Sequence, residues 1–344
     1  MGSVDFANKL ACALLLELTF ATVAIASPLF ERQEVIELRL AGPVGALFEN
    51  REERTERPFV MHSDGLAQPL KVSLRGHSRV RVCDFPPLRL NFPADANGRS
   101  VFAGQDKLKL VTHCRNYDRG EQDLLEEYLA YRILNILTDL SFRVRLLRLH
   151  YDDSDGILPL EAARRYAFVI ESREEFSART SARNVVLSGF PLHRHDQRQA
   201  ALIYVFQYLI ANTDWMLLKA DYDDGCCHNL ELFQLDSRLI FVPYDFDVAG
   251  LINARYAFPD AQLRIRRVTQ RLYRGLCTDR TILRDALRTV RSNSEEILAV
   301  TGDIPGLEPD NAERARGYLD DFFAEAADEE GLLQKFERQC IEGY

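Results

Sequence analysis

Alternation of apolar and polar residues from residue 58 to about residue 112 constrains the fold more than any other feature of the sequence. The stretch from Leu70 to Val82 alternates at period two, and PLRLNF and KLKLVTH do the same. This period is typical of a half-buried β-strand. Two more strands are expected in SFRVRLLRLHY and RRYAFVIES. The first half of the chain is therefore predicted to be rich in strands.

Helical patterns appear once within this first half and then dominate the second. Residues 121–140 predict a helix among the strands, and the strongly apolar residues 198–212 predict a buried one. LELFQL and RLIFVPY predict a β-hairpin, and the chain from about residue 262 onward is expected to be helical. This order of strands and helices predicts an α+β fold. Its β-rich part is expected at 27–172 and its mainly helical part at 173–344, with a cleft between the two lobes.

The N-terminal residues depart from this pattern. Lys9 precedes the mostly apolar run LACALLLELTFATVAIAS, whose small residues suit a signal-peptidase cut after Ala26. Residues 1–26 are therefore predicted to be a signal peptide, with a buried N-terminal helix as the alternative. No later stretch is long enough to cross a bilayer, so no transmembrane span is expected in the mature chain. Export to the periplasm or the cell exterior is predicted, or a cytoplasmic location if the segment is not cleaved.

Charge and cysteine content narrow the classes of function. The net charge of −9 and the pI near 5.4 argue against a general nucleic-acid binder, which usually carries a basic excess. Cleavage after Ala26 would leave an even number of cysteines, which permits disulfides in pairings that the sequence leaves open. No CxxC pair occurs, so a structural zinc site is not expected.

Four polar residues stand where loops meet apolar elements in the second half: Asp214, Asn229, Asp245 and Asp247. A hairpin between residues 229 and 244 would bring Asn229 and Asp245 to the same end, because a hairpin returns the chain to its start. The loop before the hairpin would place Asp214 nearby. Carboxylate and amide oxygens suit Mg²⁺ or Mn²⁺, and a metal-free carboxylate could orient or deprotonate a hydroxyl.

The first half of the chain contains lysines that could bind a phosphate group. Lys107 and Lys109 share one face of a predicted strand, and Glu126 or Glu127 in the following helix could pair with such a lysine. Together with the acidic set, these groups match the needs of phosphoryl transfer. Each group also has a plainer interpretation. The two aspartates can form a solvated loop, the lysines can face solvent, the glutamates can favour a helix N-terminus, and His228 can be a core histidine.

Several segments resemble the spore-coat protein H (CotH) group of atypical protein-kinase-like proteins, in an uncharacterised bacterial branch. They cover roughly residues 70–260 in the expected order, and RGxSR, NTDW…HN and PYDFD are the most specific of them. The matching segments are RGHSRVRVCDFPPLRLNF, QDKLKLVTHCRN, EEYLAYRILNIL, YAFVIES, NTDW, HNLELF and VPYDFD.

The resemblance implies a bilobal protein-kinase-like fold with ATP and Mg²⁺ or Mn²⁺ as cofactors. It makes Asp214 the counterpart of the catalytic aspartate, Asn229 and Asp245 metal ligands, and Asp247 a second candidate ligand. It makes Lys109 the phosphate lysine with Glu127 as its helix partner, and Arg89 an alternative phosphate-side cation. The sequence also departs from the general kinase pattern. No GxGxxG loop precedes the lysine, and Asp214 and Asn229 stand 15 positions apart, far more than in HRDxxxxN.

Three functional hypotheses follow from these observations. The first is an exported, metal-dependent kinase that transfers a phosphoryl group from ATP to a hydroxyl of a protein substrate. The second is a non-catalytic envelope or surface protein that uses the same fold for binding. The third is a transferase whose DxD holds a metal and a sugar nucleotide.

A cluster of arginines after the acidic set has two interpretations. It could dock an acidic substrate, or it could pair with the acidic C-terminal helix YLDDFFAEAADEE, which is the more common fate of a charge run. The cluster consists of Arg264, Arg266, Arg267, Arg271 and Arg274.

Overall fold

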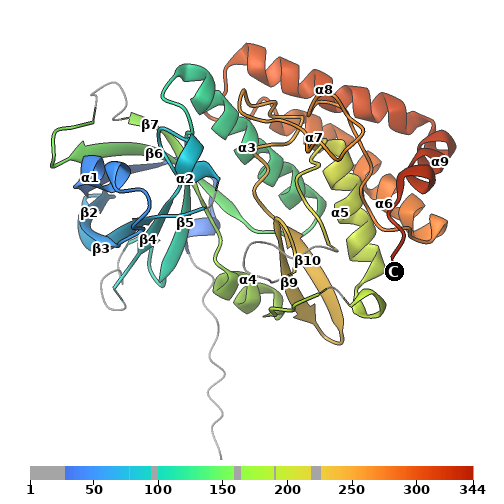
Figure 1. The fold of residues 1–344 in the computed structure, drawn as a ribbon, viewed down its shortest axis with the longest axis horizontal. Coiled ribbons are helices and arrows are strands. Elements are labelled where there is room, and N and C mark those ends of the chain that lie inside the picture. The colour runs from blue at the N-terminus through green and yellow to red at the C-terminus, as the bar shows by residue number, and fades with distance from the viewer. Residues whose placement is uncertain are drawn as a thin grey trace, which may run out of the picture.

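Seven strands close into a β-barrel in the computed structural model of the chain (Figure 1). The order around the barrel is β1-β2-β3-β4-β5-β7-β6, and β6 returns beside β1 in parallel, with Ile36 opposite Leu147. The structure describes residues 28–76, 78–93, 100–158, 164–189, 191–217 and 226–343, so the predicted signal peptide at 1–26 lies outside the described residues. The barrel strands are β1 (Ile36–Gly42), β2 (Arg57–Ser63), β3 (Leu66–Leu74), β4 (Leu88–Asn91), β5 (Lys107–Thr112), β6 (Val144–Asp153) and β7 (Arg164–Ile170).

The closed barrel contradicts the predicted bilobal protein-kinase-like fold with a mainly helical second lobe. That prediction is wrong because alternation identifies strands without showing which of them pair. The parallel pairing of β1 with β6 closes the sheet and joins residues more than a hundred positions apart. In the second part of the chain, the predicted hairpin is present as β9 and β10, and β8 extends it to a three-stranded sheet. These strands are β8 (Arg183–Asn184), β9 (Leu230–Leu235) and β10 (Arg238–Pro243).

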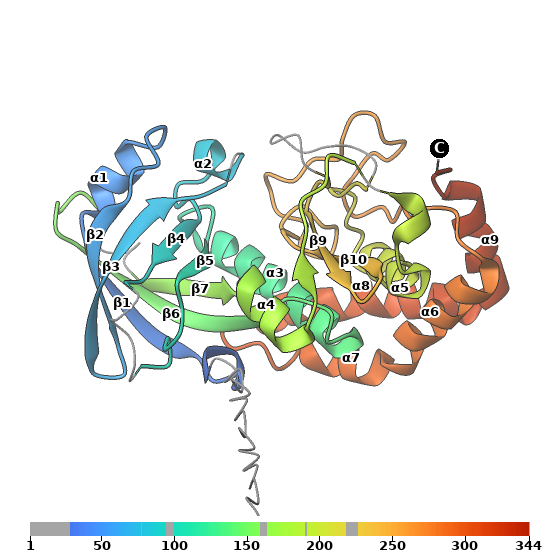
Figure 2. The same ribbon diagram turned by 90° about the horizontal axis from the view of Figure 1, so that it is seen from below.

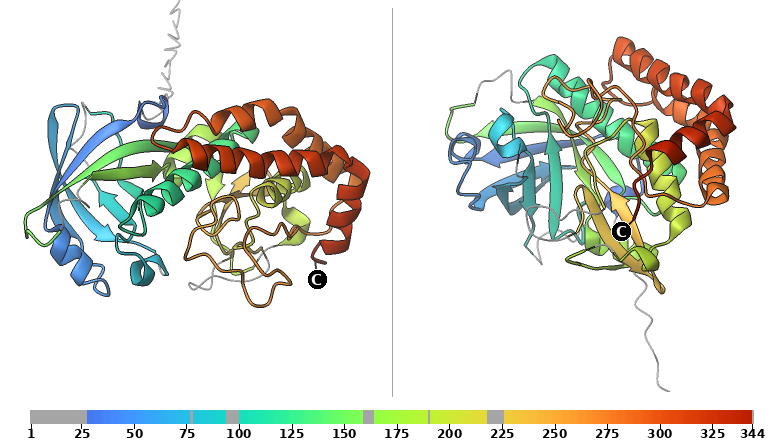
Figure 3. Two further views of the ribbon diagram at one scale, coloured as in Figure 1. Left: turned by 90° about the horizontal axis from the view of Figure 1, so that it is seen from above. Right: turned by 45° about the vertical axis from the view of Figure 1, so that its right-hand side comes forward.

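Helix α3 (Asp118–Leu137) lies between the barrel and the later helices of the chain, among which α8 (Pro309–Ala327) is the longest (Figures 1 and 3). The predicted helices at 121–140 and 198–212 correspond to α3 and α5, each shifted toward the N-terminus. The other helical elements are η1 (Pro28–Phe30), α1 (Val44–Glu49), α2 (Arg79–Val82), α4 (Arg173–Thr180), η3 (Leu192–Arg194), α5 (Gln197–Leu209), α6 (Arg280–Ser292), α7 (Ser294–Val300) and α9 (Glu329–Gln339).

Strand β7 separates two hydrophobic cores. Its residues Ala167 and Val169 belong to the core inside the barrel, whereas Phe168 and Ile170 belong to the larger core around α3 and α5. Side chains alternate between the two faces of a strand, so a strand that is covered on both sides must be apolar on both. The apolar run YAFVI satisfies that condition, and it fixes α3 against the outside of the barrel, where Tyr131 packs on Phe168.

Two local predictions differ from the structure. The alternating stretch 70–82 is not one strand, because β3 ends at Leu74 and residues 79–82 form the short helix α2. Glycine at position 76, with a φ of 90°, lies between the two elements and turns the chain. The expected helix at 262–276 is also absent: this segment has no helical residues, and its arginines are distributed around irregular backbone.

The six described cysteines lie in three pairs: Cys83–Cys114, Cys226–Cys227 and Cys277–Cys340. Cys277–Cys340 joins the segment before α6 to the end of α9, across a sequence separation of 63 residues. Such a long closed loop restricts the unfolded chain, which stabilises the folded one. Among the described residues, no helix combines the length and the apolar character that a membrane span requires.

Candidate functional site

The open end of the β9–β10 hairpin brings together the predicted residues Asp214, Asn229 and Asp245. Leu230 pairs with Pro243 at the last position of the hairpin, and the backbone N–H of Tyr244 donates to Asn229 O at 3.1 Å. Asn229 and Asp245 both adopt left-handed backbone conformations, with φ values of 54° and 63°. Asn and Asp tolerate this region better than most residues, so they can turn the chain at both strand ends.

Asp214 is held against the hairpin by its neighbours. Asn229 Nδ2 donates to Asp214 O at 2.7 Å and to its Oδ2 at 3.0 Å, and His228 Nε2 lies 3.1 Å from Oδ1. The backbone N–H of Asp214 donates to Asn212 Oδ1 at 3.0 Å. The carboxylate nevertheless remains 41% exposed. It is therefore both oriented and accessible, as a group that acts on an external hydroxyl must be.

A buried arginine, Arg79 of α2, ties this end of the hairpin to the barrel and to α3. Its Nη2 lies 3.0 Å from Glu127 Oε1 and 2.7 Å from Asp245 Oδ1, and its Nε lies 2.9 Å from Asp247 Oδ2. Arg79, Glu127 and Asp247 are almost fully buried, while the Asp245 side chain is 38% exposed. One guanidinium thus faces three carboxylates from two segments.

Burial and mutual repulsion raise the pKa values of the two buried acids in this cluster, and Arg79 opposes that rise. Burial raises the pKa of Glu127 above its ordinary value, and the nearby carboxylates of Asp247 and Asp245 raise it further against the effect of Arg79. Burial and Asp245 likewise raise the pKa of Asp247. Arg79 faces all three acids, and the buried Arg75 also interacts electrostatically with Asp245, so two arginines offset three carboxyl groups.

Lys109 lies beside the same end of the hairpin. Its Nζ is 3.5 Å from Glu231 Oε1 of β9 and 4.6 Å from the centre of the Tyr244 ring. Burial lowers the pKa of Lys109 to about 8, with Arg75 and Arg173 adding to the effect and Glu231 opposing it. Arg89, the alternative cation, stands opposite Lys109 in the β4–β5 register and is exposed.

The predicted ion pair between Lys109 and Glu127 is not formed, because Lys109 pairs with Glu231 and Glu127 pairs with Arg79. Sequence reasoning missed Arg79 as a functional residue. The signal that could have identified it is the RGxSR motif itself, whose second arginine is Arg79. The motif contains two arginines, but the sequence does not indicate which acidic residues they pair with.

Helix α3 carries a second buried group of charges. The side chain of Glu126 is fully buried, 3.1 Å from Arg119 and in contact with Arg314 of α8. Arg119 also lies 2.8 Å from Asp123. Burial raises the pKa of Glu126 to about 7 and that of Asp123 to about 6, although the arginines oppose both shifts. These ion pairs join α3 to α8 behind the hairpin end.

The raised pKa of Glu126 predicts a pH-dependent stability. In the unfolded chain this carboxyl titrates near 4.5, whereas in the folded protein its pKa is about 7, so folding takes up a proton between these values. The contribution of the Glu126 carboxyl group to the free energy of unfolding is fully present below its unfolded pKa. It is lost as the pH rises through the folded pKa. Relative to a Glu126→Gln variant, wild-type stability should fall by on the order of 2 kcal/mol from about pH 5 to about pH 7.5.

Urea unfolding of both proteins across this range measures the effect. Burial lowers the pKa of His113 to about 3, so this histidine makes stability rise with pH, opposite to the effect of Glu126. His113 is present in both proteins, so the comparison with the variant removes its contribution. A difference between the two proteins that stays constant with pH would contradict the assignment.

The residue types at the hairpin end fit a divalent cation that is bound together with a phosphate. In the part of the chain that the structure describes, no three His, Cys, Asp or Glu side chains are grouped to hold a metal. Mg²⁺ needs fewer protein ligands, because it keeps several waters and binds through one or two carboxylates plus substrate phosphates. Asp245 supplies a half-exposed carboxylate, and Asn229 has its amide oxygen left for a cation because Nδ2 donates to Asp214.

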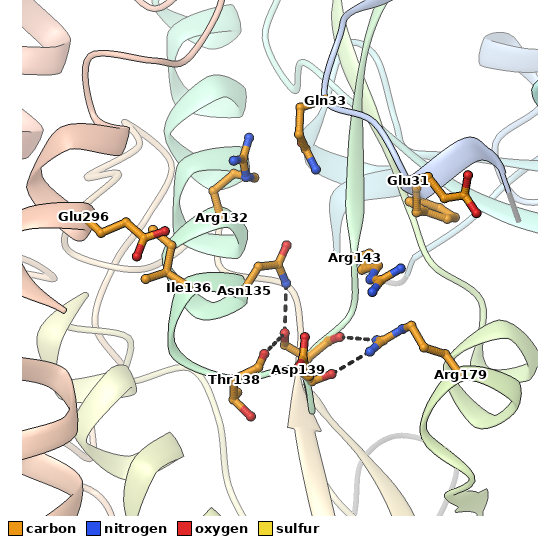
Figure 4. A pocket seen from close by; sticks show the side chains of 12 residues that line it. Glu31, Gln33, Arg132, Asn135, Ile136, Thr138, Asp139, Arg143, Arg179 and Glu296 are labelled. Carbon is orange, nitrogen blue, oxygen red and sulfur yellow. Dashed lines mark hydrogen bonds between the residues drawn. The ribbon is translucent and has the colours of Figure 1, made fainter. Parts of the chain in front are cut away.

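A separate cavity of about 510 Å³ lies at the C-terminal end of α3 (Figure 4). Its floor is the turn after α3, where Asn135 Nδ2 donates to Ser141 Oγ at 2.9 Å. Charged side chains of both signs line the cavity. They include the basic Arg132 and Arg143 and the acidic Glu31 and Glu296. None of the predicted site residues lines this cavity, so it is distinct from the hairpin end.

No protein-family model matches the chain, and no curated protein has significant similarity to it. The resemblance to the CotH group therefore stays a prediction that rests on the quoted segments. The case for a function has to be made from the geometry of the hairpin end itself.

Proposed function

We propose that the hairpin end is a phosphoryl-transfer site that moves a phosphoryl group from ATP to a hydroxyl of a protein. The observation that carries the proposal is the convergence of an oriented but exposed Asp214, the oxygen ligands Asn229 and Asp245, and the cation Lys109. Phosphoryl transfer relies on positioning and on electrostatic stabilisation of the phosphates, which these groups can provide. The segments that resemble the CotH group support the same assignment.

Each residue has a defined role in this proposal. Asp214 orients the acceptor hydroxyl and takes its proton, held in place by His228 and Asn229. Asn229 and Asp245 hold Mg²⁺ or Mn²⁺, which neutralises phosphate charge when bound. Lys109 contacts the phosphates, and its pKa of about 8 keeps it mostly protonated at neutral pH. Asp247, which is buried against Arg79, positions Asp245 through that shared guanidinium.

Nucleotide-dependent thermal stabilisation tests the binding part of the proposal. With Mg²⁺ or Mn²⁺ present, ATP at about 100 times its Kd should stabilise the wild type by about 2.7 kcal/mol. Asp245→Asn should remove this gain, because it weakens the cation that the nucleotide phosphates share. Asp236→Asn is a matched control, since Asp236 lies at the opposite end of the same hairpin and also has a positive φ, of 51°.

Two results would count against the site. One is a wild type that melts at the same temperature with and without ATP and metal. The other is an Asp245→Asn variant that is stabilised as much as the wild type. Chelation of the metal should reproduce the effect of Asp245→Asn in the wild type if the cation links the protein to the nucleotide.

One observation favours a second candidate, a non-catalytic binding protein. Arg79 already neutralises Asp245 at 2.7 Å, so the carboxylate can be satisfied without a metal. In that case the hairpin end would be a structural junction, and Asp214→Asn would leave every biological effect of the protein intact. Nucleotide binding that depends on Asp245 separates the two candidates, because a purely structural junction predicts none.

A further inference from the structure

Three exposed arginines stand on the long irregular segment between Asp247 and α6. Arg264, Arg266 and Arg267 face solvent, and no carboxylate of the described residues forms an ion pair with them. The acidic C-terminal helix pairs with other partners instead. Glu329 and Glu330 of α9 contact arginines of α6, including Arg284. The arginines of a charge run usually pair with acidic residues of the same protein, but within the described residues these three side chains do not.

The other two arginines of the cluster turn inward and fix the segment. Arg271 donates to Leu209 O at 3.3 Å and packs 4.1 Å from the centre of the Tyr318 ring. Arg274 donates to Thr213 O, next to Asp214. Just before them in the chain, Thr269 O accepts a hydrogen bond from Tyr318 Oη at 2.9 Å. The exposed arginines thus precede a stretch of backbone that these contacts anchor.

This segment contacts the proposed site or its surroundings near both of its ends. At one end, Arg255 lies over the Tyr117 ring at the start of α3, 5.5 Å from its centre, and Tyr256 hydrogen-bonds Asp247. At the other end, Arg274 interacts electrostatically with Asp214. Figure 2 shows orange loops beside β9 and β10. A protein that presents a hydroxyl to Asp214 would pass next to it.

We propose that Arg264, Arg266 and Arg267 form a docking surface for an acidic stretch of the protein substrate, with aspartates or glutamates next to the acceptor hydroxyl. The inference rests on the proposed function and names the class of its substrate. The chain as a whole carries a net charge of −9, and these three exposed guanidinium groups add positive charge to a segment whose residues interact with Asp247 and with Asp214. Guanidinium groups bind carboxylates in two-pronged geometry, and a positive surface steers acidic partners toward it.

An apolar contact is available on the same segment. Phe258 is 76% exposed. Aromatic side chains next to arginines are common in surfaces that bind other proteins. Phe258 therefore offers a bound protein an apolar contact on the same segment as the arginines.

Binding of two labelled peptides to the full-length protein tests the inference without requiring turnover. The first peptide has a serine flanked by glutamates, and the second has glutamine at each glutamate position. The acidic peptide should bind about tenfold more tightly at low salt, as expected for three exposed ion pairs, and the advantage should shrink as salt rises. Fluorescence anisotropy measures both affinities.

The triple variant Arg264→Gln, Arg266→Gln and Arg267→Gln should bind both peptides with equal, weak affinity. Its matched control removes three exposed arginines elsewhere, in Arg164→Gln, Arg198→Gln and Arg238→Gln, and should keep the preference for the acidic peptide. Equal binding of the two peptides by the wild type, or an unchanged preference in the triple variant, would overturn the docking surface.

Transfer kinetics separate this inference from the proposed function. With the acidic peptide, the triple variant should raise KM about tenfold and leave kcat unchanged, because docking arginines do not touch the reacting atoms. Acid-specific binding without any transfer to either peptide would overturn the proposed function and leave the docking surface standing. Transfer that favours the glutamine peptide would overturn the docking surface alone.

Discussion

Replacing Arg79 by methionine should lower the free energy of unfolding by about 3–5 kcal/mol. Methionine keeps much of the side-chain length but removes the charge that faces Glu127, Asp245 and Asp247. Glu127 and Asp247 would then be buried carboxylates without their cation. Breaking one side of a buried ion pair costs this much because the remaining charge cannot reach water.

Urea unfolding of Arg79→Met beside Arg81→Met measures the effect. Arg81 lies on the same short helix but is exposed, so its replacement should change stability by less than about 0.5 kcal/mol. Adding Glu127→Gln to Arg79→Met should recover part of the loss, because it removes one of the stranded charges. A loss below about 1 kcal/mol for Arg79→Met, or a double variant that is less stable still, would show that the cluster is not held by charge pairing.

The hairpin end is the part of the site that the sequence predicts well. Two apolar runs with a short connection specify an antiparallel pair, and the pairing of Leu230 with Pro243 follows from the position of the turn. Asn229 and Asp245 then have to meet, because they flank the two paired strands. Local rules of this kind need no knowledge of the rest of the fold.

The partners of Arg79 show what such rules cannot provide. Glu127 is 48 positions away in the sequence and Asp245 is 166 positions away. Alternation assigns residues 79–82 to a strand, which would project Arg79 differently from the helical turn that the structure contains. The resemblance to the CotH group makes Lys109 the expected partner of Glu127. In the structure, the position of Glu231 on β9 brings a different acid to Lys109. Contacts of this kind depend on how whole elements pack.

Closure of the barrel is a similar case at the level of the fold. The strand sequences are compatible with an open sheet or a closed one, since both bury one face of each strand. Only the register of β1 against β6, with Ile36 opposite Leu147, makes the sheet continuous. The alternation of β6 is consistent with this role: Leu147 and Leu149 fill the barrel, while Leu146 packs outside it.

Replacing Asp214 by asparagine should reduce phosphoryl transfer by about 10²–10⁴-fold and leave nucleotide binding intact. The amide keeps the shape of the side chain and can still accept from Asn229 Nδ2, so the local structure should persist. It cannot take the proton of an acceptor hydroxyl. The loss should therefore appear in kcat, while ATP with Mg²⁺ or Mn²⁺ stabilises the variant as it does the wild type.

The pair Asp214→Asn and Asp245→Asn divides the site into its two functions. Asp245→Asn should lose both nucleotide binding and transfer, whereas Asp214→Asn should lose transfer alone, because the proposal assigns Asp245 to the cation and Asp214 to the acceptor. Labelled-phosphate transfer to a serine peptide, measured beside thermal stabilisation by ATP, reports both. An Asp214→Asn variant with wild-type kcat would remove Asp214 from the chemistry. Loss of nucleotide binding in that variant would instead place Asp214 among the groups that hold the cation and its phosphates.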